Sequence, residues 1–436
     1  MKILIFILCI LAAIILGTKT KINIGVFALL FAMVLNFVFF QQAGSATLKS
    51  YFPTGSVPIM ICSMMFFGCL SCSGVVNVLT RRVGRKMKSS KALAAVLMVW
   101  LLTFAVGFAV GGSTVIMYAV VPFGVNLMIE LGLNPTLGVV AVWGGYLSCG
   151  FFPWSGAGVV NGGLADNSFE AGMGQTSTMI SALLLIVYVV ILLVVLTLIT
   201  RKKDYSQFRD SLIQTEDDES LYTFTDTQRR ALIVIICVMT VIIVPNVLGF
   251  IARKSALFKL LKKLDIAICF MAGSLALCAL KCADMTEVIS KKMPWKNIVL
   301  LFGMCTLFGL AQPLGLVDAF AALASKLPPM LIAPILAGSQ AFLSSFVSGL
   351  VLGPLFVPLC GPLAAASGLP IAYLCALQYS GAAVSSVSPA SGAGAICLST
   401  IGDAKISSHV AAGMAKVAVA NVFGYALFAF IAQFLF

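Results

Sequence analysis

Two short segments of the chain share a pattern of residues that suits ion binding. The first reads PWSGAG at 153–158 and the second reads PASGAG at 389–394. Proline removes a backbone donor, glycine permits unwound backbone, and serine adds a hydroxyl group. A helix broken in this way presents free N–H groups, which favour anions, and free carbonyl groups, which favour a hard cation such as Na⁺. We therefore predict two broken helices whose breaks bind ions.

The composition predicts the environment of these breaks. Of 436 residues, 61% are hydrophobic and 10% are charged, and the mean hydropathy is +1.08, whereas a soluble protein carries roughly a quarter charged residues. Many apolar runs are long enough to cross a ~30 Å hydrocarbon core as helices, which satisfy their own backbone hydrogen bonds there. We predict an all-α polytopic membrane protein of the plasma (inner) membrane, with the lipid bilayer as its first partner.

The polar residues exclude several other classes. The net charge of +13 agrees with the positive-inside rule, so we expect no nucleic-acid partner. The 13 cysteines lie in apolar runs without disulfide spacing, and the single histidine, His409, leaves no imidazole cluster. We expect no transition metal and no cofactor. No His/Asp/Glu constellation falls at membrane depth, which predicts no catalytic residues and no enzyme activity.

The two halves of the chain align without a gap at an offset of 236 residues. Between 112 and 158 the alignment has 12 identities in 47 positions, where composition alone predicts about four. The matches include Pro122 with Pro358 and Gly145 with Gly381, as well as the two hexapeptides. If one apolar pair in each half forms a hairpin that does not span, each half crosses the membrane five times. An odd number of crossings makes the second repeat inverted, as in many secondary transporters.

This topology divides the chain into three parts. The first inverted repeat covers 1–200, with a re-entrant hairpin at about 92–131 and a broken helix at about 135–172. A hydrophilic cytoplasmic linker covers 201–230, as a loop or short surface helices. The second repeat covers 231–436, with a hairpin at about 329–367 and a broken helix at about 370–402. With both termini extracytoplasmic, most Lys and Arg residues fall inside, although the basic segment 253–263 falls outside.

The candidate site residues lie at the two hairpin tips and the two hexapeptides. Glycine and serine also let helices pack closely, but packing needs neither a proline nor a repeat at matched positions. The predicted substrate-binding residues are Ser113, Thr114, Pro153, Trp154, Ser155, Asn161, Ser348, Gly349, Ser388 and Ser391. The predicted Na⁺-binding residues are Gly112, Ser113, Gly156, Ser348, Gly349 and Gly392.

The absence of certain charged residues limits which ion can drive transport and which groups can bind an anion. Differences between the two repeats point to further candidates. The apolar segments hold no Asp or Glu pair for a proton relay, and no Arg or Lys is placed to clamp a carboxylate. Helix N-termini, hydroxyls and bound cations must then neutralise an anion, which favours Na⁺ over proton coupling. Trp154 stands opposite Ala390 in the repeat, and either pocket sizing or packing explains its bulk. Three roles are open for Asn161: contact with the solute in the site, capping of a helix, or a hydrogen bond between helices.

The layout resembles the ion-transporter superfamily that includes the divalent anion/sodium symporters. GTKTKINIGVFALLFAMVLNFVF at 17–39 is similar to the N-terminal region of the MatC malonate/dicarboxylate carriers, and DMTEVISKKMPWKNIVLLFGMCTLFGLAQPLG at 284–315 resembles the opening of their second core. The resemblance implies inverted repeats and a homodimer in which a transport domain moves against a fixed scaffold, the elevator mechanism. Those symporters carry Ser-Asn-Thr at each hairpin tip, whereas this chain has Gly112-Ser113-Thr114 and Ser348-Gly349-Leu350. Both tips lack the Asn, and the second also lacks the Thr, which argues against a standard dicarboxylate site but not against the cation sites, which use backbone carbonyls.

Together these observations predict a secondary active transporter of a small, dicarboxylate-like organic anion, coupled to Na⁺. Three alternatives stay open: an exchanger or exporter of another anion, a proton-coupled carrier on the same fold, and an anion channel. Mobile hairpins and breaks at the membrane midplane favour alternating access over a channel.

Overall fold

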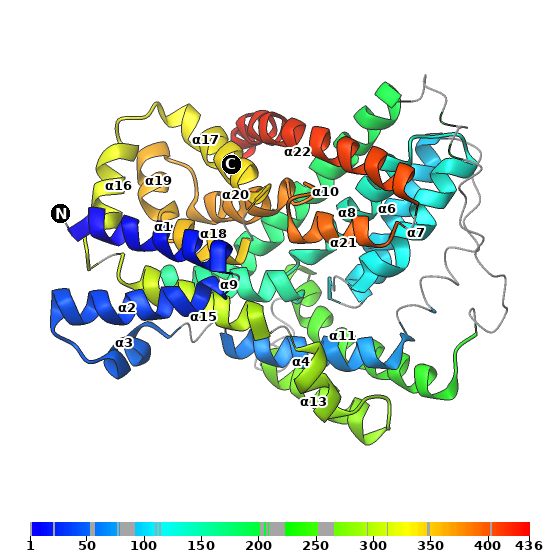
Figure 1. Ribbon diagram of the computed structural model, residues 1–436, viewed down its shortest axis with the longest axis horizontal. Coiled ribbons are helices and arrows are strands. Elements are labelled where there is room, and N and C mark those ends of the chain that lie inside the picture. The colour runs from blue at the N-terminus through cyan, green and yellow to red at the C-terminus, as the bar shows by residue number, and fades with distance from the viewer. Residues whose placement is uncertain are drawn as a thin grey trace.

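The computed structural model describes residues 2–20, 22–52, 57–75, 78, 92–109, 111–112, 115–200, 205, 208, 223–251, 266–293, 295–311, 313–346, 349–401 and 403–436. Within these ranges the chain is helical and has no β-strand (Figure 1). The all-α fold class predicted from the sequence is therefore confirmed.

The first half contributes α1 (Lys2–Thr20), α2 (Ile24–Phe40), α3 (Gly44–Tyr51), α4 (Val57–Ser73), α6 (Ala92–Ala109), α7 (Val115–Glu130), α8 (Pro135–Gly150), α9 (Gly156–Ser168) and α10 (Met173–Thr200). The second half contributes α11 (Asp226–Ile251), α13 (Ile266–Ala279), α14 (Met285–Glu287), a π-helical turn (Val288–Lys292), α15 (Trp295–Gly309), α16 (Leu316–Ala324), α17 (Pro329–Ser344), α18 (Gly349–Phe356), α19 (Cys360–Ser367), α20 (Ile371–Val384), α21 (Gly392–Ser399), α22 (Ala404–Ala432) and a last 3₁₀ turn (Gln433–Leu435).

Helices of the two halves recur at the spacing seen in the sequence. Helices α8 and α20 begin at 135 and 371, and α9 and α21 begin at 156 and 392. Each pair is separated by the same 236 residues. The segments predicted as broken helices are thus two helices with a break between them, at 151–155 in the first half and at 385–391 in the second.

Each predicted hairpin also contains more than one helix. In the first, α6 and α7 are joined through Gly111 and Gly112, which both have positive φ, 68° and 72°. In the second, α17 is followed by α18 and α19, which meet at an angle of 58°. Pro354 lies inside α18 and Pro358 follows it, and proline removes a helical hydrogen bond. This additional bend differs from the simple hairpin predicted at about 329–367.

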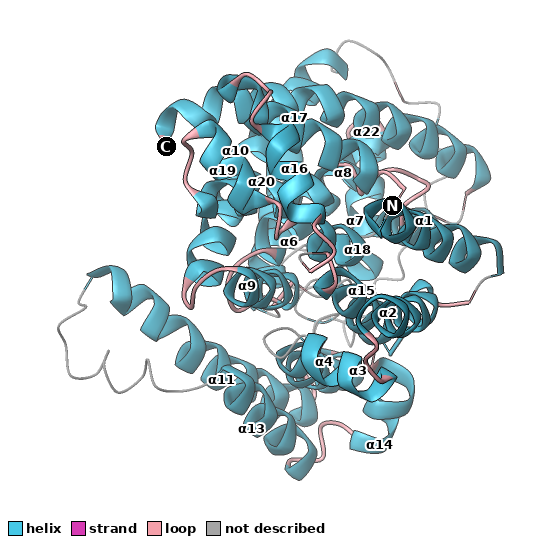
Figure 2. Cartoon of the chain, turned by 90° about the vertical axis from the view of Figure 1, so that its left-hand side faces the viewer, coloured by secondary structure: helices cyan, strands magenta, loops and turns pink. Residues whose placement is uncertain are grey.

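Helices from opposite halves pack against one another outside the hairpins. Helix α2 contacts α15, and α4 contacts α13. At the first crossing, Gly25 and Gly303 lie backbone to backbone, and a Cβ on either would clash with the other helix. Helices α4, α11 and α13 form a group in the lower part of the molecule in Figures 1 and 2.

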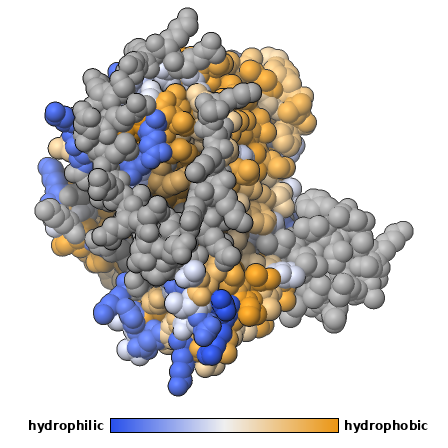
Figure 3. Space-filling view, turned by 90° about the vertical axis from the view of Figure 1, so that its right-hand side faces the viewer, coloured by the Kyte–Doolittle hydropathy of each residue, from blue (hydrophilic) through white to orange (hydrophobic). Residues whose placement is uncertain are grey.

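The exposed surface is that of a multi-pass membrane protein. Among the described residues, three helices are long and apolar enough to cross a membrane, namely α6, α10 and α22 with its 3₁₀ turn, and two bent pairs, α2 with α3 and α18 with α19, raise the number to five. Large apolar side chains such as Leu30, Val187 and Phe423 are exposed. In Figure 3, hydrophobic side chains spread over much of one face, with hydrophilic ones at its left and lower margins.

The region between the halves differs in part from the predicted loop. Helix α11 begins at Asp226, inside the predicted linker. Tyr205 and Phe208 are buried and contact the His409 ring, and the Asn134 amide donates to the Tyr205 hydroxyl at 3.2 Å. Part of the linker is therefore packed on the helical core.

Candidate functional site: two helix breaks and their hairpins

The first break is closed by a serine cap. The Ser155 hydroxyl donates to the carbonyl groups of Gly150 and Phe152, the latter at 2.7 Å, and accepts from the Gly158 N–H at 3.1 Å. It is the N-cap of α9, and Gly158 must be glycine because a Cβ there would clash with the Phe152 carbonyl. Pro153 and Ser155 are both buried. One hydroxyl thus satisfies backbone groups on both sides of the break.

The second break repeats this geometry residue for residue. The Ser391 hydroxyl donates to the carbonyls of Ser386 and Ser388, the latter at 2.8 Å, and accepts from the Gly394 N–H at 3.0 Å. A Cβ on Gly394 would clash with the Ser388 carbonyl. The repeated P-x-S-G-A-G sequence therefore encodes one capped break, built twice. In this structure both serines act on the backbone of their own break.

The first hairpin tip is joined directly to the first break. The Gly156 N–H donates to the Gly111 carbonyl at 3.0 Å. A Cβ on Gly112 would come within 2.8 Å of the Gly150 Cα. Gly112 and Gly156, two predicted cation-site residues, are thus brought together at the end of α8.

The second hairpin lies against the helix that precedes the second break. The Ser385 N–H donates to the Ser344 hydroxyl of α17 at 3.1 Å. A Cβ on Gly349 would lie 3.2 Å from the Ala382 carbonyl of α20. The predicted residue Gly349 therefore contacts α20 one turn before the break.

Each broken helix also reaches the hairpin of the other half. Helix α9 contacts α18, where a Cβ on Gly353 would lie 3.5 Å from the Asn161 amide oxygen. Helix α21 contacts α7. Each broken helix therefore contacts the hairpins of both halves, which is the arrangement that a shared central site requires.

A direct hydrogen bond links the segments that carry the two breaks. The Trp143 indole N–H of α8 donates to the Ser386 hydroxyl at 3.1 Å. Trp143 is fully buried. Neither residue was among the predicted site residues, because no local pattern marks a pair that is so far apart in the chain.

Aromatic side chains surround the first break. Trp154 is 3% exposed and stacks on Phe152 with ring centroids 5.0 Å apart. Phe108 of α6 meets both rings edge-on, at 5.4 Å and 5.1 Å. Phe104 and Trp100 continue the row along α6. Of the two roles open for Trp154, packing is the one that this geometry supports.

Polar side chains surround the second break instead. The Asn421 amide of α22 donates to the Val384 carbonyl, the last of α20, at 2.6 Å, and its oxygen accepts from the Tyr188 hydroxyl at 2.9 Å. The Ser385 hydroxyl donates to the Ala418 carbonyl at 3.1 Å. These bonds satisfy the helix end that the break leaves open.

The predicted site residues fall into three groups. Buried at the breaks are Pro153, Trp154, Ser155, Gly156, Ser388 and Ser391. Gly112, Asn161 and Gly349 are half-buried, and Gly392 is exposed. Ser113, Thr114 and Ser348 lie outside the described residues.

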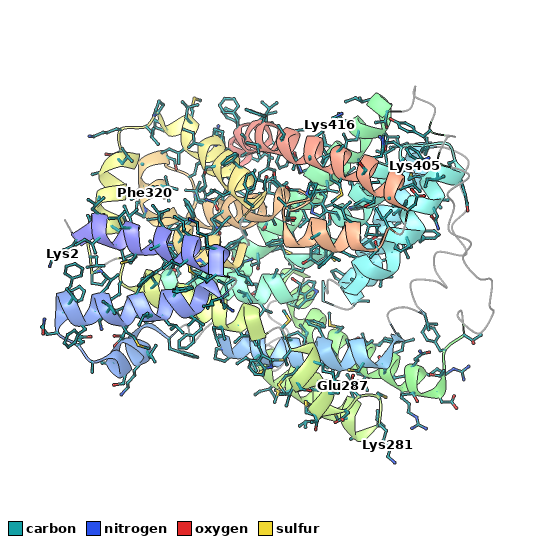
Figure 4. All side chains as sticks on the ribbon, viewed as in Figure 1. Lys2, Lys281, Glu287, Phe320, Lys405 and Lys416 are labelled. Carbon is teal, nitrogen blue, oxygen red and sulfur yellow. The ribbon has the colours of Figure 1, made fainter. Side chains whose placement is uncertain are left out.

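The breaks bear no formal charge of their own. Residues 135–165 and 371–401 contain no Asp, Glu, Lys or Arg. Labelled charged residues such as Lys2 and Lys281 lie at the edges of the molecule (Figure 4). The partial positive ends of α9 and α21 and the carbonyls around them are thus the charge-bearing groups of the breaks.

Comparison with known proteins gives the family. The model of the citrate transporter family, CitMHS, matches residues 6–351, more than half of the chain. No curated protein sequence matches significantly.

Two solved structures share the fold. MtrF of Neisseria gonorrhoeae, described among antimetabolite efflux pumps, is 14% identical with a TM-score of 0.58, covering 93% of this chain and 85% of its own. The YdaH transporter of Alcanivorax borkumensis is 13% identical with a TM-score of 0.57, covering 90% and 87%. At such identity the likeness concerns the fold alone. By the family match, this chain belongs to the citrate transporter family and is a secondary transporter, not an enzyme.

Proposed function

We propose that the protein carries a small organic anion of the dicarboxylate type across the plasma (inner) membrane, driven by Na⁺. The observation that carries this proposal is the pair of serine-capped breaks in helices that each contact the hairpins of both halves. Membership of the citrate transporter family supports a carboxylate as the solute.

The geometry of the breaks suits both ions. The first N–H groups of α9 and α21 give a partial positive charge that favours a carboxylate. The carbonyls of Gly150 and Ser386 keep a second lone pair after accepting from serine, and oxygen ligands of this kind suit Na⁺. The carbonyls of Phe152 and Ser388 accept from both the hydroxyl and the backbone N–H of the capping serine. We assign the cation to Gly112, Gly156, Gly349 and Gly392 with Ser113 and Ser348. The anion is assigned to the remaining candidates together with Ser113, Ser348 and Gly349, which serve both ions.

We further propose a homodimer that works as an elevator, with both termini extracytoplasmic and the two repeats inverted. In this view the crossings of α2 with α15 and of α4 with α13 belong to the fixed scaffold. The close Gly25–Gly303 approach supports a rigid role for the first crossing, because two backbones in direct contact leave no soft side chains between them.

The test is uptake by protein reconstituted into vesicles. Labelled citrate, succinate and malonate are offered under an inward Na⁺ gradient, under a proton gradient, and with neither. We expect accumulation of at least one of the three only with the Na⁺ gradient. Accumulation driven by the proton gradient alone would contradict the Na⁺ coupling, and steady currents without saturation would identify a channel.

A further inference from the structure

One residue of the central helix α8 is less buried than all its neighbours. Helix α8 packs against α6, α7, α10 and α22. Every residue from Pro135 to Gly150 is buried except Tyr146, which is half-buried. Because α8 is packed among these other helices, the exposed part of Tyr146 indicates a space inside the molecule.

The other sides of α8 leave no room for such a space. A Cβ on Gly144 would clash with Val189 of α10, and a Cβ on Gly145 would clash with the backbone of α6. A Cβ on Gly138 would clash with the backbone of Gly124 in α7. The sides of α8 that face α6, α7 and α10 are therefore closely packed.

The remaining side of α8 is open near its end. Trp143, Tyr146 and Gly150 are spaced by three and four residues and therefore share one face of the helix. Gly150 is buried, yet a Cβ added to it would meet no atom within 4 Å. The open space thus lies beside Gly150, one turn beyond Tyr146 on the same face.

This face of α8 is directed at the second break. The Trp143 indole N–H donates to the Ser386 hydroxyl, which belongs to that break. Helix α8 also contacts α21, the helix that follows the break, and the Tyr146 hydroxyl interacts electrostatically with the Cys397 thiol of α21. Since Gly150 directly precedes the first break, the open space lies where the two breaks approach each other.

The Tyr146 hydroxyl is available to a ligand. Among the described residues, none donates a hydrogen bond to this hydroxyl or accepts one from it. The hydroxyls of Tyr188, Tyr373 and Tyr425, in contrast, donate to Asn421, to the Ala429 carbonyl and to Ser380. A tyrosine hydroxyl inside a protein usually has a partner, so the free hydroxyl of Tyr146 points to a bound molecule.

We propose that Tyr146 is a solute-binding residue, whose hydroxyl donates a hydrogen bond to a carboxylate oxygen of an anion held beside Gly150. The equivalent position of the second repeat is Ala382, which is buried. Only the first half therefore supplies this hydroxyl, although the face that carries it is directed at the second break. The inference rests on the proposed function and adds Tyr146 to the anion site described there.

Two tyrosine variants provide the test. Purified wild type, Tyr146→Phe and Tyr373→Phe are heated in NaCl with citrate, succinate or malonate, and the ligand-induced rise of the unfolding midpoint gives an apparent Kd. We expect Tyr146→Phe to keep the ligand-free midpoint and to weaken binding about tenfold, because it removes only a hydrogen bond to a charged ligand. Tyr373→Phe should do the reverse, since its hydroxyl donates to the Ala429 carbonyl at 3.0 Å.

A second pair of variants tests the space itself. Gly150→Leu should fill the space and weaken binding more than Gly150→Ala, whose Cβ meets no atom within 4 Å. Wild-type affinity in Tyr146→Phe or in Gly150→Leu would overturn the inference alone. So would a Tyr146→Phe variant that lost midpoint and kept affinity, as expected of Tyr373→Phe. If no carboxylate stabilised wild type, the proposed function itself would fall, and the inference with it.

Discussion

The backbone N–H of Gly156 donates to the carbonyl of Gly111, so the tip of the first hairpin and the start of α9 are one hydrogen-bonded unit. Gly111 has φ of +68°, a conformation that L side chains rarely adopt. A Cβ at Gly111 would also clash with the Phe67 ring of α4. The tip is thus held by conformation, by packing and by a hydrogen bond at once.

Gly111→Ala should therefore lower the free energy of unfolding by more than the cost of its positive φ alone, because the new Cβ would also clash with the Phe67 ring. Gly132→Ala is the matched control, because Gly132 has φ of +67° and a Cβ there would meet no atom within 4 Å. The control should cost about 1–2 kcal/mol of unfolding free energy, seen as a modest drop in the thermal midpoint in detergent. Equal drops of the thermal midpoint for the two variants would show that the clash with Phe67 adds nothing to the loss of stability.

Gly158→Ala and Gly394→Ala should each prevent correct folding, because each Cβ would clash with a carbonyl oxygen of its own break. Monodisperse yield on size-exclusion chromatography measures the effect. Gly150→Ala is the control: Gly150 closes α8, its Cβ would meet no atom within 4 Å, and alanine is the better helix former. A normal yield of Gly158→Ala would mean that the first break relaxes more than its capped geometry allows.

The Trp143–Ser386 hydrogen bond should show up as a coupling between the two halves. In a double-mutant cycle of Trp143→Phe and Ser386→Ala, we expect an interaction free energy of about 1 kcal/mol in unfolding, since a single buried neutral hydrogen bond contributes about that much. Trp295→Phe in place of Trp143→Phe serves as the control and should show no interaction free energy with Ser386→Ala, because the Trp295 indole N–H donates to the Ile289 carbonyl near the surface. Strict additivity of the two changes would argue that the bond is not formed in solution.

Asn421→Leu copies the equivalent residue of the first half, Leu185, and should destabilise the second break. It leaves the Val384 carbonyl without the bond from Asn421, and the Tyr188 hydroxyl without its acceptor. Unpaired buried groups cost about 1–3 kcal/mol each, so the thermal midpoint should fall by several degrees. Tyr188→Phe, which removes only the hydroxyl, should cost less, and adding it to Asn421→Leu should recover part of the loss.

The sequence predicted the helical architecture well because that architecture depends on local residue types. Proline, glycine and serine at fixed spacing specify a capped helix break almost regardless of context, so 153–158 and 389–394 could be located from residue types alone. Long apolar runs likewise predicted an all-helical membrane protein, which the helices and the family match confirm.

What could not be predicted depends on contacts between distant segments. The bond from Trp143 to Ser386 joins residues 243 positions apart, and no local pattern announces such a pair. The surroundings of the two breaks also depend on contacts between distant helices. Phe108 of α6 meets the Phe152 and Trp154 rings at the first break, and Ser344 of α17 accepts from the Ser385 N–H at the second.

The row of rings beside the first break has an optical consequence. The chain has four tryptophans, and Trp100 and Trp154 lie in that row while Trp143 bonds to Ser386 across the halves. Three native fluorophores thus sit where the hairpin and the breaks meet. Emission from the unmodified protein, excited at the indole band, will report any rearrangement of this region as the transporter works, without an attached dye.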